Sequence, residues 1–419
     1  MNREVRFTRL NNGVRIVSES VPGAASVTAG LWIENGSRYE SEGVRGVSHF
    51  IEHMLFKGTP TRSALRIAEE IESVGGAINA FTGKESTCYH TRTPAAELPR
   101  SLDVLSDMFL NSNFHPDDIE LEREVILQEI YDAEDMPEDS VHDYFLESYW
   151  PGHPLGWAVA GTVDTVGSIR SEEILAFRND RYRPDRVLIA ASGALDHDRF
   201  VELCRERFVG IQGSFEPGVL DRPDVRPGLF VRNRDLEQIH IVIGFPGITT
   251  QDPRRYAADL LISALGGGMS SRLFQDIREK RGKAYTVYAF QSAFQEIGYT
   301  GVYAATSRDA VGEVVDLTLE AVSRIVEQGL HADELERTKS QIIGGIPLSL
   351  ESTENRMFRI ARNRLFFDRE VPVEEVTRSI AAVTNQDIID VAREIFSFER
   401  LGVALLGDAD ARMISLPAS

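Results

Sequence analysis

The sequence predicts an α+β fold with two domains, each combining a mostly antiparallel sheet with a layer of helices. With 419 residues the chain is too long for one hydrophobic core, because single cores stop growing near roughly 250–300 residues. Each half opens with strand-like runs and continues with helical periodicity. A stretch rich in proline and glycine, without an apolar period, separates the halves. We therefore predict domains at 1–212 and 229–419, joined by a linker at 213–228.

The first half begins with a predicted β-hairpin. Asn11-Asn12-Gly13 is a turn sequence, and the runs Val5 to Leu10 and Val14 to Ser18 on either side are suited to strands. The apolar run from Ser26 to Ile33 predicts a buried strand. Apolar residues at helical spacing then predict a helix over 47–55. This helix carries the most informative residues of the chain.

Five consecutive residues, His49-Phe50-Ile51-Glu52-His53, form the inverted zinc hydrolase motif His-x-x-Glu-His. The apolar neighbours occupy one helix face, so His49, Glu52 and His53 share the other at i, i+3 and i+4. Two histidines one turn apart can ligate one Zn²⁺. Glu52 is spare as a ligand and can act as a general base. The alternative is a helix that carries these three residues on a solvated face.

A catalytic zinc usually holds three protein ligands and one open position, so a third ligand is needed. Pro116, followed by two acids, predicts a helix start, and the helix continues to Ile130. Glu122 and Glu129 lie seven residues apart on one face of that helix. One of them can bind the metal while the other hydrogen-bonds a ligating imidazole. Alternatively, both are solvated surface carboxylates.

The stretch HFIEHMLFKGT, from His49 to Thr59, followed by Glu129, resembles the pitrilysin family of zinc metallopeptidases. Within that family the chain is most similar to the short branch of mitochondrial processing peptidase β-subunits and their bacterial relatives. The resemblance covers essentially the whole chain. It implies that His49, His53 and Glu129 bind zinc and that Glu52 is the catalytic general base. It also implies that Glu122 hydrogen-bonds a ligand from outside the coordination sphere.

The second half repeats the order of the first without the zinc motif. Ile239 to Phe245 predicts the corresponding strand, and Arg255 to Leu265 takes the place of the motif helix. The resemblance implies a diverged duplication with one catalytic half. It further implies that Arg278 and Tyr285 help to bind the substrate carbonyl. A guanidinium and a phenol are suitable donors for the oxyanion of a tetrahedral intermediate.

The alternating stretch 77–82 follows a helix that stops at Gly75-Gly76, and it predicts a strand. In the family that the chain resembles, this strand lies at the sheet edge and pairs with an extended peptide. The resemblance therefore implies that Asn79, Ala80 and Phe81 bind substrate. Main-chain pairing gives affinity without demanding a particular sequence. Taken alone, the stretch would be an ordinary strand.

The composition favours peptides over nucleic acids as partners. A formal net charge of -20 argues against nucleic acid and suits cationic partners. Many acids follow the proposed ligand Glu129, and they form either a solvated face or a site that selects basic residues in a peptide. These acids are Asp132, Glu134, Asp135, Glu138, Asp139 and Asp143.

We expect a bacterial cytoplasmic protein. No apolar run approaches the roughly 18 residues of a membrane span, so no membrane partner is expected. Met1-Asn2-Arg3-Glu4 does not open a signal peptide. The two cysteines, Cys88 and Cys204, have no metal-binding spacing and suggest a reducing compartment, with a single disulfide as the alternative.

Two functions follow from this sequence. The first is a zinc endopeptidase that cleaves peptides or unfolded, presequence-like segments. The alternative is a non-catalytic structural or docking subunit that kept the fold. Such subunits lose motif residues, whereas this chain has both the zinc set and the pair Arg278 and Tyr285. Because one chain carries both sets, the resemblance implies a homodimer and not an obligate heterodimer.

Overall fold

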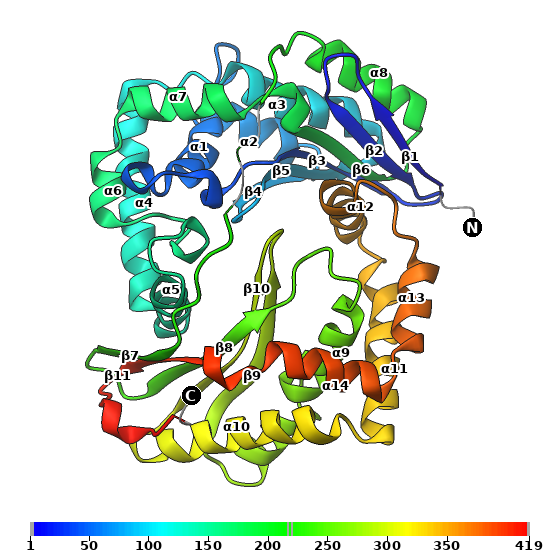
Figure 1. Cartoon of the computed structure of the whole chain (residues 1–419). Coiled ribbons are helices and arrows are strands. Elements are labelled where there is room, and N and C mark those ends of the chain that lie inside the picture. The colour runs from blue at the N-terminus through cyan, green and yellow to red at the C-terminus, as the bar shows by residue number, and fades with distance from the viewer. Residues whose placement is uncertain (1–3, 216–217, 219–220, 417–419) are drawn as a thin grey trace. The chain divides into compact units, whose positions relative to one another are not determined.

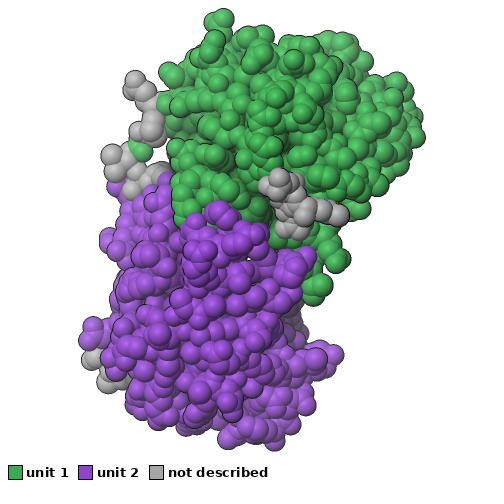
Figure 2. Space-filling model, turned by 90° about the vertical axis from the view of Figure 1, so that its right-hand side faces the viewer, with its two compact units in different colours: residues 1–132, 157–219, 348–371 green, residues 133–156, 220–347, 372–419 purple. Residues whose placement is uncertain are grey.

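A computed structural model describes residues 4–215, 218 and 221–416, and its elements are labelled in Figure 1. The chain forms two compact units, which Figure 2 shows in different colours. Unit 1 comprises residues 1–132, 157–219 and 348–371, and unit 2 comprises residues 133–156, 220–347 and 372–419. Residues 1–3, at which no signal peptide is expected to begin, lie outside the described residues. So do residues 216–217 and 219–220 of the predicted linker.

Unit 1 contains a six-stranded sheet in the order β1-β2-β6-β3-β5-β4. Neighbouring strands are antiparallel except for the parallel pair β2 and β6. The predicted hairpin, the buried strand and the strand at 77–82 are all present, and β4 lies at the edge of the sheet. The strands are β1 (Glu4–Arg9), β2 (Arg15–Ser20), β3 (Ser26–Ile33), β4 (Ala77–Thr82), β5 (Thr87–Pro94) and β6 (Val187–Gly193).

Most helices of unit 1 contribute apolar side chains to one core together with the sheet. The motif helix α1 supplies Phe50 and Ile51, and neither has measurable exposure. The helices are α1 (Val47–Leu55), α2 (Ala64–Glu72), α3 (Leu98–Asn111), α4 (Pro116–Asp135), α6 (Val163–Ser168), α7 (Ser171–Arg181), α8 (His197–Phe208) and α12 (Thr353–Phe367). The last residues of α4, beyond Asp132, belong to unit 2.

Helix α12 comes from the second half of the chain and packs against strands of unit 1 in a separate apolar cluster. Its buried Met357 lies so close to β3 that a Cβ at Gly30 would stand 2.8 Å from the Met357 sulfur. Arg356 of α12 forms a 2.9 Å ion pair with Glu19 of β2, and both side chains are buried. This helix is therefore an integral part of the first unit.

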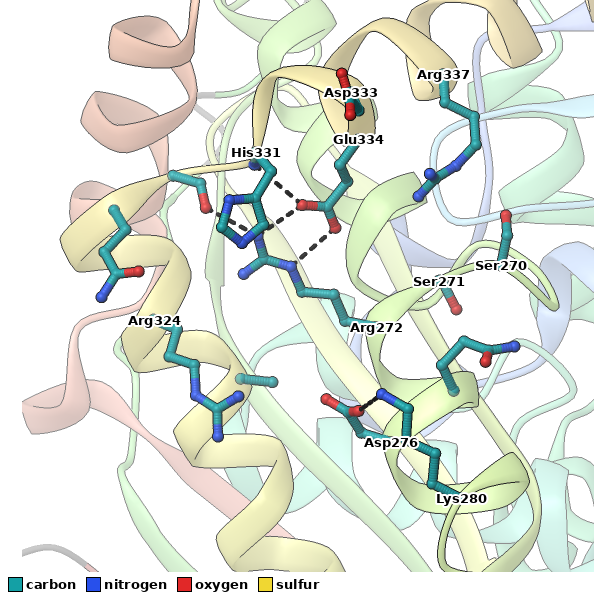
Figure 3. A pocket seen from close by; sticks show the side chains of 14 residues that line it. Ser270, Ser271, Arg272, Asp276, Lys280, Arg324, His331, Asp333, Glu334 and Arg337 are labelled. Carbon is teal, nitrogen blue, oxygen red and sulfur yellow. Dashed lines mark hydrogen bonds and ion pairs between the residues drawn. The ribbon is translucent and has the colours of Figure 1, made fainter.

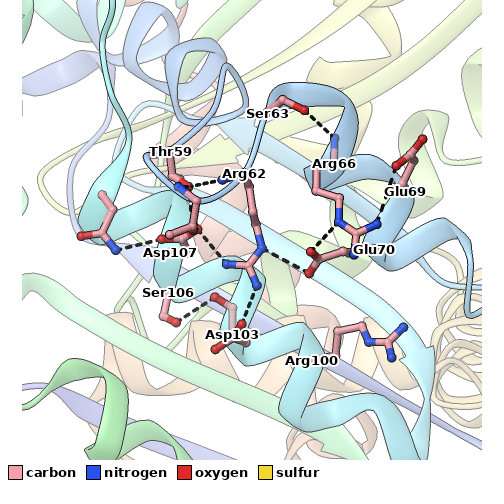
Figure 4. Close-up of polar contacts among 12 residues, drawn as sticks. Thr59, Arg62, Ser63, Arg66, Glu69, Glu70, Arg100, Asp103, Ser106 and Asp107 are labelled. Carbon is pink, nitrogen blue, oxygen red and sulfur yellow. Dashed lines mark hydrogen bonds and ion pairs between the residues drawn. The ribbon is translucent and has the colours of Figure 1, made fainter.

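The loop between α1 and α2 is fixed by a polar network around Asp107 of α3 (Figure 4). The Asp107 carboxylate accepts hydrogen bonds from Thr59, Thr61 and Arg62 at 2.7–2.9 Å. Burial opposes the negative charge, but these bonds and one from Asn111 hold the pKa of Asp107 below its usual range. The end of the HFIEHMLFKGT stretch is thus anchored to α3.

Unit 2 contains a five-stranded sheet in the order β7-β11-β8-β10-β9, again with one parallel pair, β7 and β11. The strands are β7 (Gly228–Asn233), β8 (Ile239–Gly247), β9 (Ala284–Ala293), β10 (Gly298–Thr306) and β11 (Gly402–Gly407). The helices are α5 (Pro137–Tyr149), α9 (Arg255–Gly266), α10 (Val311–Gln328), α11 (Ala332–Ser349), α13 (Val373–Ala382) and α14 (Asn385–Ile395), of which α11 belongs to unit 2 up to Pro347.

Helix α5 comes from the first half of the chain and packs on the sheet of unit 2. Phe145 of α5 occupies the space above Gly244 of β8 and Gly402 of β11. A Cβ at Gly244 would lie 2.2 Å from a ring carbon of Phe145, so only glycine leaves room for the aromatic ring. The exchange of helices is therefore reciprocal: α12 completes unit 1 and α5 completes unit 2.

The two sheets share one topology, since β2-β6-β3-β5-β4 matches β7-β11-β8-β10-β9 in order and in the position of the parallel pair. Helix α1 follows β3, and α9 follows β8, as predicted. The predicted fold class, two similar α+β domains with mostly antiparallel sheets, is confirmed. The compact units do not coincide with residues 1–212 and 229–419, because each unit takes one helical segment from the other half. Cys88 and Cys204 are both buried and unpaired.

No helix of the described part of the chain is both long enough and apolar enough to cross a bilayer.

Candidate metal centre

A buried carboxylate fixes the start of the motif helix α1. Gly46 precedes the helix with a φ of +91°, and a Cβ there would lie 2.5 Å from the Ala160 carbonyl oxygen. The two carboxylate oxygens of Glu40 accept hydrogen bonds from the backbone N–H groups of Gly46 and Ser48, both at 2.8 Å. Glu40 is only 5% exposed, and burial raises its pKa to about 7. Glu40 thereby takes the place of a side-chain helix cap.

Helix α1 divides its side chains between two faces, as the sequence predicts. Val47, Phe50, Ile51, Met54 and Leu55 are buried in the core of unit 1. The side chains of His49 and His53 each remain 18% exposed on the other face. Because the apolar face is anchored, the two imidazoles are presented at a fixed rotation of the helix.

Glu129 of α4 meets both imidazoles. Its Oε2 lies 3.7 Å from Nε2 of His49 and 3.5 Å from Nε2 of His53. Candidate ligand atoms of the three residues all lie within 4.8 Å of one another, and among the described residues no other His, Cys, Asp and Glu side chains form such a group. Ligands about 2.0–2.1 Å from a tetrahedral zinc lie roughly 3.3–3.4 Å apart. The donor set therefore suits Zn²⁺, and the two distances from Glu129 exceed this spacing by only a few tenths of an ångström.

The protonation of the two histidines differs. Burial, and then the nearby charge of His53, lowers the pKa of His49 to about 4, so its imidazole is neutral near pH 7. Burial would also lower the pKa of His53, but its hydrogen bond with Glu122 and the charge of Glu129 raise it. His49 Nδ1 is buried and has no hydrogen-bond partner among the described residues.

Glu122 orients His53. Its Oε2 lies 2.9 Å from Nδ1 of His53, which leaves Nε2 of the same ring directed at Glu129. Its Oε1 forms an ion pair with the Lys57 ammonium group. Glu122 is 2% exposed, and although burial opposes its negative charge, the bonds from His53 and Lys57 lower its pKa. The carboxylate therefore stays ionised and holds His53 in place.

Glu52 lies beside His49, His53 and Glu129, and a residue of the sheet holds its carboxylate in place. The hydroxyl of Thr82, at the end of β4, donates a 2.6 Å hydrogen bond to Glu52 Oε2. Burial raises the pKa of Glu52, while this bond and the charge of His53 act in the opposite direction. Within the described part of the chain this hydrogen bond leaves the other oxygen, Oε1, unengaged, so Oε1 can face a reacting water.

The predicted peptide-binding residues lie on the edge strand β4. Asn79 and Phe81 are exposed, whereas Ala80 and Thr82 alternate with them and are partly buried. Phe81 packs edge to face against Trp32 and Phe358, with ring centroids 5.5 and 5.8 Å apart. Phe81 therefore faces away from α1, and Thr82 faces toward it.

Arg278 and Tyr285 lie in unit 2, whereas the residues of the metal centre lie in unit 1. The structure brings the two side chains together, with the Arg278 guanidinium carbon 5.1 Å from the centroid of the Tyr285 ring. Tyr285 is 74% exposed. Its hydroxyl is thus accessible to a ligand.

Three residues of the site were missed by sequence reasoning: Thr82, Lys57 and Glu40. Lys57 stands within the HFIEHMLFKGT stretch, and a cation four residues after His53 is a local signal for an acidic partner. Thr82 ends a predicted strand, but its contact with Glu52 depends on how β4 packs against α1. Glu40 has no local signal, because its function depends on a loop that returns to the helix start.

The sequence matches two family models. Residues 15–163 match the model described as Insulinase (Peptidase family M16), and residues 168–342 match the model described as Peptidase M16 inactive domain. Together they span most of the chain. The second model matches the half without the zinc motif up to residue 342.

Several bacterial proteins are similar over nearly their whole length, and each is named an uncharacterized zinc protease. One from Streptomyces coelicolor is 40% identical over 96% of this chain and 89% of that protein. One from Bacillus subtilis is 36% identical over 96% of this chain and 97% of that protein. One from Mycobacterium tuberculosis is 38% identical over 98% of this chain and 95% of that protein.

Solved structures share the fold at lower sequence identity. A protease from Helicobacter pylori superposes with a TM-score of 0.90 at 20% identity, over 97% of this chain and 100% of that chain. A Peptidase M16 inactive domain from Pseudomonas fluorescens also gives a TM-score of 0.90, at 18% identity, over 97% and 98% of the two chains.

Proposed function

Because this chain belongs to the M16 peptidase family, we propose that it is a zinc-dependent endopeptidase that cleaves peptides or unfolded, presequence-like segments. The observation that carries the proposal is the convergence of His49, His53 and Glu129 at zinc spacing, with the carboxylate of Glu52 beside them. The names of the relatives support zinc as the metal. We infer the processing-peptidase-like branch from the stretch His49 to Thr59.

In this proposal His49, His53 and Glu129 hold the metal. A bound Zn²⁺ supplies Lewis acidity, which polarises the scissile carbonyl and lowers the pKa of water. Glu52 accepts a proton from the attacking water at its carboxylate and delivers it to the leaving amine. Thr82 fixes the Glu52 carboxylate through one oxygen, so that the other is directed to the proton being transferred. Glu122 keeps the His53 ring in the orientation that presents Nε2.

The edge strand β4 supports the choice of an extended peptide as substrate. An exposed sheet edge offers N–H and C=O groups to which a peptide can add as another strand. The Ala80 N–H here donates to Asn79 Oδ1 at 2.8 Å, a bond that a peptide carbonyl would replace. We propose that residues 79–81 make these contacts. The acids at the end of α4 and in α5, such as Asp135 and Asp139, favour peptides with basic residues.

We further propose a homodimer in which Arg278 and Tyr285 of one chain serve the substrate at the metal centre of its partner. Their mutual contact and the exposure of Tyr285 support a ligand-binding role. The alternative, a non-catalytic docking subunit, is less well supported, because every residue that the chemistry needs is present. We propose the bacterial cytoplasm as its compartment, with peptides and not membranes or nucleic acids as partners.

The proposed function is tested by combining metal analysis with peptide-cleavage profiling. We expect one zinc per chain and cleavage of a library of unstructured peptides, lost on chelation and restored by zinc. The Glu52→Gln chain is the matched control, since it should retain the metal. A zinc-loaded wild-type protein that cleaves no member of the library, as monomer or dimer, would favour the docking role.

A further inference from the structure

Unit 2 contains a polar cavity of about 430 Å³ that is separate from the residues of the metal centre (Figure 3). It is bounded by the end of α10, the start of α11 and the segment 270–280. Its walls carry hydroxyl, amide and charged groups. The volume is sufficient for a small polar ligand.

The lining of this cavity is basic, although the chain as a whole is acidic. Four cationic side chains and three carboxylates line it, on a protein with a formal net charge of -20. Two of the cations are neutralised inside the cavity. Arg272 forms a bidentate pair with Glu334 at 2.8 and 2.7 Å, and Lys280 pairs with Asp276 at 2.8 Å.

The two remaining cations, Arg324 and Arg337, are available to a ligand. Arg337 has no ion pair or hydrogen bond with any described residue. Among the residues that the structure describes, Arg324 pairs only with Glu320, one turn earlier on the same exposed helix face. Such surface ion pairs contribute little to stability, so a ligand can readily replace Glu320 as the partner of Arg324. Figure 3 shows Arg324 and Arg337 on two different helices, with Arg272 between them. Asp333 is the third carboxylate of the lining, so the four cations exceed the acids of the cavity by one charge.

The floor of the cavity is fixed before any ligand binds. Glu334 is 8% exposed and accepts the backbone N–H of His331 at 3.2 Å in addition to its pair with Arg272. Arg272 also donates to the Gly329 carbonyl at 3.0 Å. One wall contains a π-helical turn, Phe274–Glu279, which contributes Gln275 and Asp276 to the lining. Turns of this kind are rare and are frequent at functional sites.

We propose that this cavity binds an oxyanion, with Arg324 and Arg337 as its main ligands. A guanidinium presents paired N–H donors that match carboxylate and phosphate oxygens. The Ser270 hydroxyl is exposed at the same cavity and adds a donor. Arg272 contributes positive potential but stays paired with Glu334. Two kinds of ligand carry such an oxyanion: inorganic phosphate and a peptide with a free terminal carboxylate.

The test is calorimetric titration of the dimeric or monomeric protein as purified, at constant ionic strength, with three separate probes. The probes are inorganic phosphate, an acetylated dipeptide with a free terminal carboxylate, and the same dipeptide as its amide. We expect saturable binding of phosphate, or of the free dipeptide but not of its amide, and the pattern identifies the source. Arg324→Gln and Arg337→Gln should each weaken binding about tenfold to a hundredfold, the effect of removing a hydrogen bond to a charged group.

Two control variants distinguish binding in this cavity from binding elsewhere on the protein. Arg393, an exposed arginine of α14 in the same unit, lies outside the cavity, and Arg393→Gln should bind as the wild type does. His53→Ala should also retain binding, because the cavity shares no residue with the metal centre. Equal binding by the Arg337→Gln and wild-type proteins, or no binding of any probe, would overturn the proposal. Loss of binding in His53→Ala would instead assign the anion to the metal.

Discussion

Thr82 donates a 2.6 Å hydrogen bond to Glu52, which joins the edge strand β4 to the helix that carries the zinc motif. We propose that substrate pairs with this strand, so the contact links peptide binding to the position of the general base. A hydrogen bond to a charged group contributes about 1.5–3 kcal/mol. Thr82→Val should therefore lower kcat about tenfold to a hundredfold while zinc content stays unchanged. Thr82→Ser keeps the hydroxyl and should restore most of the rate; equal defects in both variants would show that the hydroxyl is not the cause.

Glu52 should be needed for proton transfer and not for metal binding. Glu52→Gln keeps the shape of the side chain but removes the base, so we expect full zinc occupancy and a rate about 10²–10⁴-fold lower. Metal analysis and single-turnover cleavage measure the two effects on the same preparation. Loss of zinc together with activity would reassign Glu52 to the coordination sphere.

His53 should be required for zinc, and Glu122 should tune its affinity. His53→Ala removes one of three ligands, so both zinc and activity should be lost. Glu122→Gln removes only the carboxylate that orients His53, and a decrease of roughly 10–100-fold in zinc affinity is expected. His115, an exposed histidine outside the cluster, supplies the matched control in His115→Ala. Full zinc occupancy in His53→Ala would exclude His53 as a ligand.

The proposed homodimer predicts complementation between two inactive chains. Tyr285→Phe should reduce the rate about 10²–10³-fold, as removal of one oxyanion donor does. In a mixed dimer with Glu52→Gln, one site carries both lesions and the other carries neither. Activity should then rise toward half that of the wild type, with zinc unchanged. Glu52→Gln mixed with a chain that carries both substitutions is the control and should stay inactive; verified mixed dimers of the first kind that also stay inactive would exclude sites shared between chains.

Glu40 should make the stability of unit 1 depend on pH. Its pKa in the folded protein is about 7, against an ordinary value near 4.5, because it is buried. The folded state thus holds this proton more tightly, and the stabilisation present below about pH 4.5 is lost as the pH rises through 7. The difference between the two pKa values corresponds to a change of about 3 kcal/mol in the free energy of unfolding. Denaturant unfolding of Glu40→Gln should show a gain in stability relative to the wild type over this range.

The measured quantity for Glu40 is the difference in unfolding free energy between variant and wild type at each pH, at saturating zinc. Glu42 is an exposed carboxylate of the same segment, and Glu42→Gln controls for the removal of charge. A difference between Glu40→Gln and the wild type that stays constant from pH 4.5 to 8 would contradict the raised pKa of Glu40.

Local periodicity was sufficient to predict the motif helix, the hairpin and the buried strand, because residues close in sequence determine these elements. The spacing of His49, Glu52 and His53 placed them on one face for the same reason. The choice of Glu129 over other acids came from family resemblance, since nothing local marks it as a ligand. The roles of Thr82 and Glu40 depend on how separate segments of the chain pack together. Local sequence patterns do not predict such contacts. The exchange of α5 and α12 between the units was missed because contiguous domains are the default expectation.

That exchange has a consequence for synthesis of the chain on the ribosome. The strands of unit 1 are complete once residue 193 has emerged, but the helix that covers Trp32 and Leu188 begins only at residue 353. Synthesis proceeds at roughly 5–20 residues per second, so this apolar surface stays uncovered for many seconds until α12 has been made. During this interval the nascent unit presents an exposed sheet face, a typical site for chaperone binding or aggregation. A chain truncated before α12 should therefore retain the zinc residues and still fail to reach a soluble native state.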